Sequence, residues 1–469
     1  EGLYRVRYGN SASSLFRIAK DVYERGVWQP VLEYFLPIQM CHMRVNEKYR
    51  VWHDCCHMDD ARMAPVDFNH IDGYVQGAST LTNYRSGDVV PGLNIGGWHD
   101  AGDFDLRVES QAGEAYILSL AYEAFDVDYD ATSIDQHKRV TEIHQPDGKP
   151  DLLQQVEHGV LSVVGAYRSL GRLYRGIICN NLRQYVMLGD AAAMTDNVIG
   201  NKDDRWVFTE INPSRELTTA AELAAVSRVL KGFNDTLSVE ALACAKELYE
   251  ITEANRDSES AKIHAAAELY LTTGEGKYKD YLLSEAEFIV RNIARVGWFV
   301  GRAEKKMNHS GFTEAVRKAM YGLRDQIDQQ SAETPYGVPY RPHIWGAGWD
   351  IQSFGFRHYF LHKAYPDIFG PEYVYDALNF VLGCHPGENT SSFASGVGTR
   401  SVTVAYGFNR ADWSYIPGGV VSGTALIRPD FPELLEFPFL WQQVEYVMGG
   451  GSSHYMFLVL AAGQLAKEE

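Results

Sequence analysis

Most of this 469-residue chain is a series of segments in which apolar residues recur at helical spacing. They stand at i, i+3 and i+4, and Gly, Pro or Asn separates one segment from the next. The expected helices are Ser11–Gly26, Glu109–Phe125, Asp151–Arg172, Glu216–Lys231, Ser238–Ile251, Ser258–Thr272, Lys277–Ile293, Gly311–Leu323, Ile351–Ala364, Pro371–Leu382 and Ser452–Leu465. Because no sustained strand alternation competes with this period, we expect an all-α fold.

Two arrangements explain such a series. Helices can be joined in hairpins and closed into a ring, or they can stack into an open α-solenoid. Length alone would allow two or three domains, although barrels run large as single units. The helical period alone leaves the ring and the solenoid open.

Composition excludes some classes of partner. The formal net charge of -18 argues against nucleic acid and anionic membranes. No apolar run reaches the roughly 18 residues of a membrane span. The chain is rich in aromatic residues, with 28 Tyr and 9 Trp. Flat aromatic faces fit sugar stacking, and they equally fit an ordinary helical core.

Residues 96–103 read Gly-Gly-Trp-His-Asp-Ala-Gly-Asp and precede an expected helix. The stretch is too rich in glycine for a helix interior, so it is expected to be a loop. It brings two carboxylates, Asp100 and Asp103, to the start of the helix, and such loops often hold catalytic groups. The alternative is that the two aspartates only cap the helix or close an Asx turn.

Cysteine and histidine gather in the loop-rich stretch Gln39–Asn94. It holds three of the six cysteines and several histidines: Cys41, His42, His53, Cys55, Cys56, His57 and His70. Thiolate and imidazole together suit a structural zinc ion. The alternative is a set of unliganded thiols beside solvent-exposed histidines.

The octet 96–103 resembles the GGW(Y/H)DAGD signature of glycoside hydrolase family 9, a family of inverting β-glucanases. Further segments resemble the family's motifs in the family's order: Lys149–Leu153, Tyr336–Asp350, Leu382–Pro386 and Ile416–Gly423. The resemblance implies an (α/α)6 barrel formed by residues 1–469 as one domain. It also implies a secreted or periplasmic location. Nothing in the chain corresponds to the immunoglobulin-like module that this subgroup usually carries.

The resemblance implies that Asp103 is the general base and that Asp100 helps to hold the attacking water. Inverting hydrolysis needs such a carboxylate on one face of the sugar and a proton donor on the other. The expected glycan cleft is lined by Trp98, Trp345, Arg410, Trp413 and Tyr415.

The resemblance also bears on metals. Cys41, Cys56 and His57 match three of the four ligands of a structural zinc site in the family subgroup. The fourth position falls near Leu106, so His70 or His99 would have to replace it. Calcium is implied by the resemblance as well, without assigned ligands.

Two departures from the family pattern bear on activity. The segment 406–410 keeps only Arg410 of the usual PHHR. More seriously, Gly450 stands where the family has its acid glutamate, and glycine cannot donate a proton. A replacement acid would be His454, Glu445, Glu388 or Asp412, which are near in sequence.

We therefore expect a hydrolase acting on a polysaccharide or oligosaccharide, with two alternatives. The chain could bind glycan without cleaving it, or it could be a polysaccharide lyase on the same barrel. The glycines and serines at 449–453 precede a helix and could receive an anion, such as the carboxylate of an acidic glycan or a sulfate.

Overall fold

The computed structural model describes residues 1–66, 73–101, 104–179, 195–340, 346–385, 392–398, 415–423, 446–449 and 451–468. Six helices of this described part form a closed ring, in which each contacts the next and the last contacts the first. In ring order they are α2 (Val108–Phe125), α4 (Pro213–Leu230), α6 (Glu259–Thr273), α9 (Ile293–Met307), α11 (Ala347–Ala364) and α14 (Ser452–Glu468). The expected (α/α)6 barrel is confirmed.

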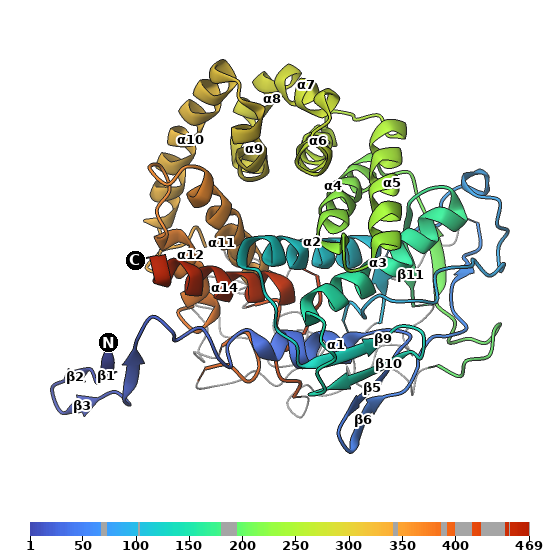
Figure 1. Cartoon of the computed structure of the whole chain (residues 1–469), viewed down its shortest axis with the longest axis horizontal. Coiled ribbons are helices and arrows are strands. Elements are labelled where there is room, and N and C mark those ends of the chain that lie inside the picture. Colours follow the sequence, from blue (N-terminus) through green and yellow to red (C-terminus); the bar gives the residue numbers. More distant parts are fainter. Residues whose placement is uncertain are drawn as a thin grey trace.

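A second layer of helices surrounds this ring (Figure 1). Its members are η1 (Val31–Phe35), which continues into α1 (Leu36–Gln39), then α3 (Asp151–Leu170), α5 (Asp235–Ile251), α7 (Gly276–Ser284), α8 (Ala286–Arg291), α10 (Ser310–Ser331) and α12 (Glu372–Val381). Each inner helix thereby buries one face against its ring neighbours and another against the outer layer. Within the described part of the chain, no helix has the length and apolar character needed to cross a bilayer.

Local sequence signals fix several helix ends. Asn212 and Asn234 cap α4 and α5, because their side chains accept hydrogen bonds from main-chain N–H groups of the first turn. Helices α3 and α6 end at Gly171 and Gly274, both left-handed, a conformation that glycine adopts without strain. These ends agree with the expected ones to within a few residues.

One expected helix is divided in two. The segment Lys277–Ile293 forms α7 and α8, which are interrupted at Glu285 and end at Asn292, where φ and ψ leave helical values. The Asn292 side chain donates a hydrogen bond to the carbonyl of Phe288, which satisfies an acceptor at the helix end. Apolar spacing continues across both breaks and conceals them. Helix α9, which follows at once, was not among the expected helices.

The expected helix at Ser11–Gly26 is wrong. Its first part belongs to two small strand pairs, formed by β1 (Gly2–Tyr4) with β4 (Phe16–Ile18) and by β2 (Arg7–Tyr8) with β3 (Ser11–Ala12). Gly9, at φ +57°, helps the chain to reverse direction between β2 and β3. The Ser13 side chain accepts the N–H of Val6, a local bond that competes with helix formation. This arm projects from the barrel (Figure 1).

Two four-stranded sheets were also missed. One has the order β6 (Arg50–His53), β5 (Arg44–Glu47), β10 (Val140–Ile143), β9 (Thr132–Asp135). The other has the order β7 (Arg62–Met63), β12 (Trp206–Thr209), β11 (Tyr174–Ile178), β8 (Leu106–Arg107). Strands of two to five residues are too short to show alternation. The second sheet matters for function because β8 directly follows the octet and leads into α2.

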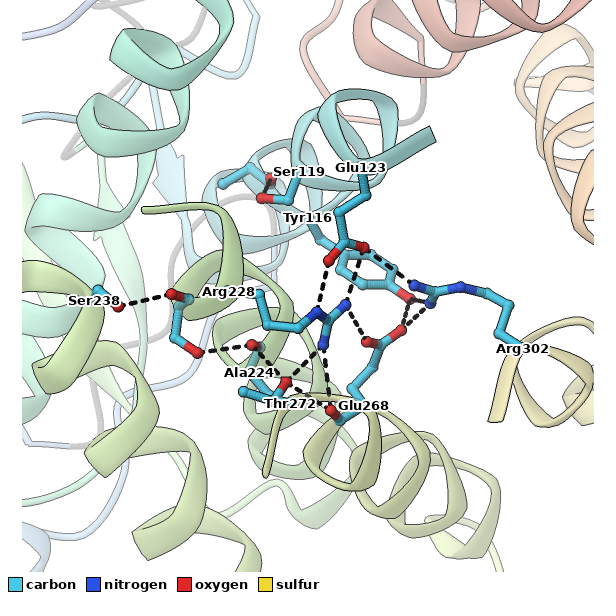
Figure 2. Close-up of polar contacts among 11 residues, drawn as sticks. Tyr116, Ser119, Glu123, Ala224, Arg228, Ser238, Glu268, Thr272 and Arg302 are labelled. Carbon is cyan, nitrogen blue, oxygen red and sulfur yellow. Dashed lines mark hydrogen bonds and ion pairs between the residues drawn. The ribbon is translucent and has the colours of Figure 1, made fainter. Parts of the chain in front are cut away.

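A buried ionic network ties four inner helices together (Figure 2). Glu268 of α6, with no exposed side-chain surface, pairs with Arg228 of α4 at 2.8 Å and with Arg302 of α9. Tyr116 of α2 donates its hydroxyl to the same carboxylate at 2.8 Å. Arg228 and Arg302 also pair with Glu123. Most of these residues lie in the C-terminal halves of their helices, so these four inner helices run parallel and the network lies at the end opposite the octet.

Candidate active site and metal centre

Asp100 lies at the entrance to α2 and is held by two partners. Its Oδ1 accepts the hydroxyl of Ser110 at 2.7 Å, and its Oδ2 pairs with the guanidinium of Arg107 at 2.8 Å. The side chain is 8% exposed. Ser110 and Arg107 come from α2 and β8, so the fold fixes the orientation of this carboxylate. Charged hydrogen bonds of this kind are stronger than neutral ones.

The segment Tyr446–Gly449, which precedes Gly450 at the family's acid position, lies against the octet. The main-chain N–H of Met448 donates to the carbonyl of Asp100 at 2.7 Å. A Cβ atom on Gly449 would lie 3.0 Å from Ser110 Oγ and 3.6 Å from Asp100 Oδ1, so glycine allows this close approach. The structure therefore brings the segment before Gly450 to the candidate base loop.

Two further motif segments complete the same end of the barrel. Val421 forms a bridge with Tyr446, and the N–H of Gly348 donates to the carbonyl of Ser422 at 3.1 Å. Gly423, at φ +111°, approaches Gly348 so closely that a Cβ would lie 2.4 Å from its nitrogen. Segments that are hundreds of positions apart in the sequence thus meet where α2, α11 and α14 begin.

The start of α14 already has an anionic partner. The N–H of Ser453 donates at 3.1 Å to the carboxylate of Glu114, which is 1% exposed and lies on α2 one turn after Ser110. A carboxylate at a helix N-terminus is favourable because the N–H groups there carry partial positive charge. The contact argues against this helix end as a pocket for a uronic acid or a sulfate.

Of the residues expected to line the cleft or to replace the acid, three lie in the described part of the chain. Trp98 is a correction: its ring is fully buried, packs against Gly159 and donates its indole N–H to Gln155 at 2.8 Å, so it cannot stack on a sugar. Tyr415 is 48% exposed. His454 packs its ring against Phe356, and burial followed by the charge of Arg357 lowers its pKa to about 4.

The other candidates lie outside the described residues. These are Asp103, His70, Trp345, Arg410, Trp413, Glu445, Glu388, Asp412 and the glycine at the acid position, Gly450. Among the described residues, sequence reasoning missed Arg107, Ser110 and Glu114. All three follow the octet, in a segment that resembles the start of an ordinary amphipathic helix. Only the structure shows that Arg107 and Ser110 contact Asp100 and that Glu114 contacts the start of α14.

A cluster of two cysteines and two histidines lies directly beneath the octet. Cys41 Sγ is 3.9 Å from Cys56 Sγ and 3.8 Å from His57 Nδ1, and Cys56 Sγ is 3.6 Å from His99 Nε2. In a tetrahedral site with ordinary zinc–sulfur and zinc–nitrogen bonds, ligand atoms stand roughly 3.3–3.8 Å apart. All four side chains are buried, and the four ligand atoms lie within 4.8 Å of one another. The cluster therefore fits a tetrahedral metal ion.

His99 reaches the cluster through main-chain pairing. Met40 and Trp98 form an antiparallel bridge, the N–H of Cys41 donates to the carbonyl of Gly97, and the N–H of His99 donates to the carbonyl of Gln39. This pairing places His99 beside Cys41. Of the two expected replacements for Leu106, His99 joins the cluster, and His70 lies outside the described residues.

The electrostatic surroundings favour metal ligation at three of the four side chains. Burial lowers the pKa of His57 to about 3 and that of His99 to about 4, so both imidazoles are neutral, as metal ligation requires. Burial opposes ionisation of Cys41, but the hydrogen bond with Cys56 and the charge of Arg205 outweigh it and place the pKa of Cys41 well below its usual range. The exception is Cys56, because burial and then the hydrogen bond with Cys41 raise the pKa of its thiol well above the usual range, so this thiol would lose its proton only when a metal binds.

Arg205 connects this cluster to the main chain at Phe104, directly after the octet. Its side chain is fully buried, pairs with Asp60, and donates to Cys41 Sγ at 3.1 Å and to the carbonyl of Phe104. Phe104 follows Asp103 and adopts φ +58°, a strained value for a bulky residue. Its ring packs against His99 at 4.7 Å between centroids. His99 and Arg205 thus both contact Phe104, the residue that follows Asp103 in the sequence.

Comparison with known proteins agrees with this arrangement. Residues 33–407 match the family Glycosyl hydrolase family 9. The chain is 21% identical over 371 residues to Endoglucanase D of Acetivibrio thermocellus, covering 72% of this chain and 53% of that protein, so it spans about half the length of this relative.

Solved structures show the same fold. A Bacteroides ovatus GH9 structure superposes with a TM-score of 0.73 at 17% identity, covering 99% of this chain and 87% of that chain. A Zn-binding triple mutant of the GH family 9 endoglucanase J30 superposes with a TM-score of 0.70 at 20% identity, covering 100% and 89%. Since the family match spans most of the chain and its motif segments meet at one end of the barrel, the chain belongs to glycosyl hydrolase family 9.

Proposed function

We propose that this protein hydrolyses glycosidic bonds of a polysaccharide or oligosaccharide with inversion, with Asp103 as the general base. The observation that supports this most is the fixed position of Asp100. Ser110 and Arg107 hold its carboxylate beside Gly449, where the family's motif segments meet. Asp103 stands three residues further along the same loop.

In this mechanism Asp103 takes a proton from a water molecule that Asp100 helps to hold. The water oxygen forms a bond to the anomeric carbon as the bond to the leaving oxygen breaks, and the leaving oxygen takes a proton from an acid on the opposite face. The Arg107 and Ser110 contacts keep Asp100 from turning away from the water.

The proton donor must differ from the family's usual one, because Gly450 stands at that position. His454 is a poor replacement, since a pKa of about 4 leaves it neutral in mildly acidic and neutral solution. The carboxyls of Glu445, Glu388 and Asp412 remain as proposed donors. Because Glu114 already accepts a hydrogen bond from the start of α14, we favour a neutral glycan over an acidic one at that helix end.

The second candidate function is glycan binding with impaired hydrolysis, and the glycine at position 450 favours it. Aryl glycosides with good leaving groups distinguish the two functions, because the leaving group of such a substrate departs without being protonated. An enzyme without a proton donor cleaves these substrates and leaves the polysaccharide intact, and Gly450→Glu should then restore polysaccharide cleavage.

The test of the proposal is a reducing-sugar assay over neutral and acidic polysaccharides, run beside affinity gels. Release of reducing ends by the unaltered protein supports the hydrolase. Binding without release supports the impaired homologue, and an absorbance band of unsaturated uronate would identify a lyase.

We further propose that the Cys41, Cys56, His57 and His99 cluster holds zinc as a structural ion. A buried site with four protein ligands leaves no open position for a substrate, and two thiolates with two imidazoles suit zinc. A secreted or periplasmic location fits a polysaccharide substrate, because such a polymer does not cross a membrane.

A further inference from the structure

We propose that the end of the barrel opposite the octet holds an anion-binding site, which receives a phosphate group. A cavity of about 400 Å³ lies there, between the C-terminal halves of α2, α4, α6, α9 and α11. This volume is within the range of pockets that hold small molecules. Because the cavity and the octet lie at opposite ends of the inner helices, the proposal does not depend on hydrolysis.

The wall of this cavity is strongly basic, although the whole chain has a formal net charge of -18. In the described part of the wall, Glu123 is the one carboxylate. The basic side chains come from three helices: Arg228 of α4, Arg302, Lys305 and Lys306 of α9, and Lys363 of α11. A local excess of positive charge in an acidic protein favours an anionic ligand.

Arg228 and Arg302 form the fixed part of the wall (Figure 2). Their side chains are 16% and 13% exposed, and both pair with Glu268 and Glu123. Glu268 has no exposed side-chain surface, so a molecule in the cavity contacts the two arginines and not this carboxylate. Because the ionic network already holds both guanidiniums, binding orders few further side chains and loses little conformational entropy.

Two lysines add charge that the described part of the protein does not balance. Lys305 and Lys306 are exposed in the last turn of α9, and neither forms an ion pair with another described residue. The C-terminus of a helix carries roughly half a negative charge, which is less than the two charges of these lysines. Lys363 pairs with Glu468 at 2.6 Å, in an exposed contact that a ligand can replace at little cost.

A phosphate group suits this set of donors. It carries close to two negative charges at neutral pH and has several acceptor oxygens. Lysine ammonium groups and arginine guanidiniums are the side chains that most often bind such a group. The cavity is larger than a phosphate ion, and Leu120, Leu271 and Phe360 give its wall an apolar part. The room beside the basic groups therefore fits a phosphate ester with an apolar body.

The test is isothermal titration calorimetry of the full chain with inorganic phosphate at constant ionic strength, with thermal unfolding in parallel. We expect one phosphate per chain and a rise in Tm of about 3 °C at a hundredfold excess over Kd. Sodium chloride of equal ionic strength should give no comparable rise. Phenyl phosphate distinguishes the two sources of the group: tighter binding than inorganic phosphate supports an ester, and equal binding supports the free ion.

The double variant Lys305→Gln/Lys306→Gln should weaken phosphate binding at least about tenfold, because it removes two charged contacts. Both lysines are exposed, so the fold should tolerate the change, and the arginines keep their partners in the ionic network. Lys318→Gln, which alters an exposed lysine on α10, is the matched control and should bind as the unaltered chain does. The proposal is overturned if the unaltered chain binds no phosphate, if sodium chloride raises the Tm equally, or if the double variant binds phosphate as well as the control.

Discussion

The main-chain N–H of Met448 donates a 2.7 Å hydrogen bond to the carbonyl of Asp100, and this bond joins the last motif segment of the chain to the first. It holds Gly449 beside the Asp100 carboxylate, where a Cβ atom on Gly449 would lie 3.6 Å from Asp100 Oδ1. The bond therefore brings the C-terminal segment Tyr446–Gly449 to the loop that holds Asp100.

Removing the Ser110 hydroxyl should reduce hydrolysis without unfolding the protein. Ser110→Ala deletes the 2.7 Å hydrogen bond to Asp100, and a bond to a charged group contributes about 1.5–3 kcal/mol. We expect kcat to fall by roughly 10- to 100-fold, because each 1.4 kcal/mol is a factor of ten. Steady-state kinetics with circular dichroism as the folding control measure this. Unchanged kcat would show that Asp100 needs no such support.

Loss of a cluster cysteine should remove the metal. Cys56→Ser should abolish stoichiometric zinc and lower the Tm, because a structural site contributes directly to folding. Cys384→Ser, at an exposed cysteine, is the matched control and should retain the metal. Elemental analysis and thermal unfolding give the readout. If the unaltered chain contains no zinc, the cluster is a set of buried thiols and imidazoles.

The buried ionic network around Glu268 should be the main cause of the loss of folding stability at acid pH. The charges of Arg302 and Arg228 outweigh burial and lower the pKa of Glu268 to about 2. A lowered pKa gives stability that is present above the ordinary value near 4.5 and is lost as the pH falls toward 2. Glu268→Gln removes a charged partner from both Arg228 and Arg302, and it should lower the free energy of unfolding by about 3–5 kcal/mol at neutral pH.

Urea unfolding of Glu268→Gln at pH 7 and pH 3 measures this cost, which should shrink at the lower pH. Glu123→Gln is the control, since Glu123 contacts the same arginines but its side chain is 29% exposed. A larger effect for Glu123 than for Glu268 would contradict this account.

Glu222 should show the opposite dependence on pH. Burial, and then the nearby charge of Glu109, raise the pKa of Glu222 well above its ordinary value. Its stabilising contribution is present below the ordinary value and is lost as the pH rises through the raised one. Its Oε2 has no hydrogen-bond partner. Glu222→Gln should therefore stabilise the fold by on the order of 1–3 kcal/mol at pH 8 and have little effect at pH 4. Stabilisation that does not depend on pH would contradict the assigned cause.

The sequence predicted most of the barrel because apolar spacing reports which face of a helix is buried. It could not show the break at Asn292, since the spacing continues across it, nor the strands at Arg44–Glu47 and Trp206–Thr209, which are stabilised by partners far along the chain. The arm at Ser11 has helical spacing and yet forms strands. A helix there would not be stable, because the arm packs on no helix that would bury its apolar face.

Residues of the candidate site could be predicted where they belong to a sequence motif. They could not be predicted where their position depends on pairing between distant segments. The octet identified Asp100, and Cys41, Cys56 and His57 followed from the motif of the metal site. His99 was only one of two alternatives, because its position depends on main-chain pairing with Gln39 and Cys41. The burial of Trp98 was missed because a tryptophan in a motif looks the same in the sequence whether it lines a cleft or a core.

The most direct test of the central claim compares the unaltered protein with Asp103→Ala on the polysaccharide that it cleaves best. If Asp103 is the general base, release of reducing ends should fall by at least about 10²-fold, while the Tm and the zinc content stay the same. Equal release by both proteins would contradict the assignment of Asp103 and with it the proposed mechanism.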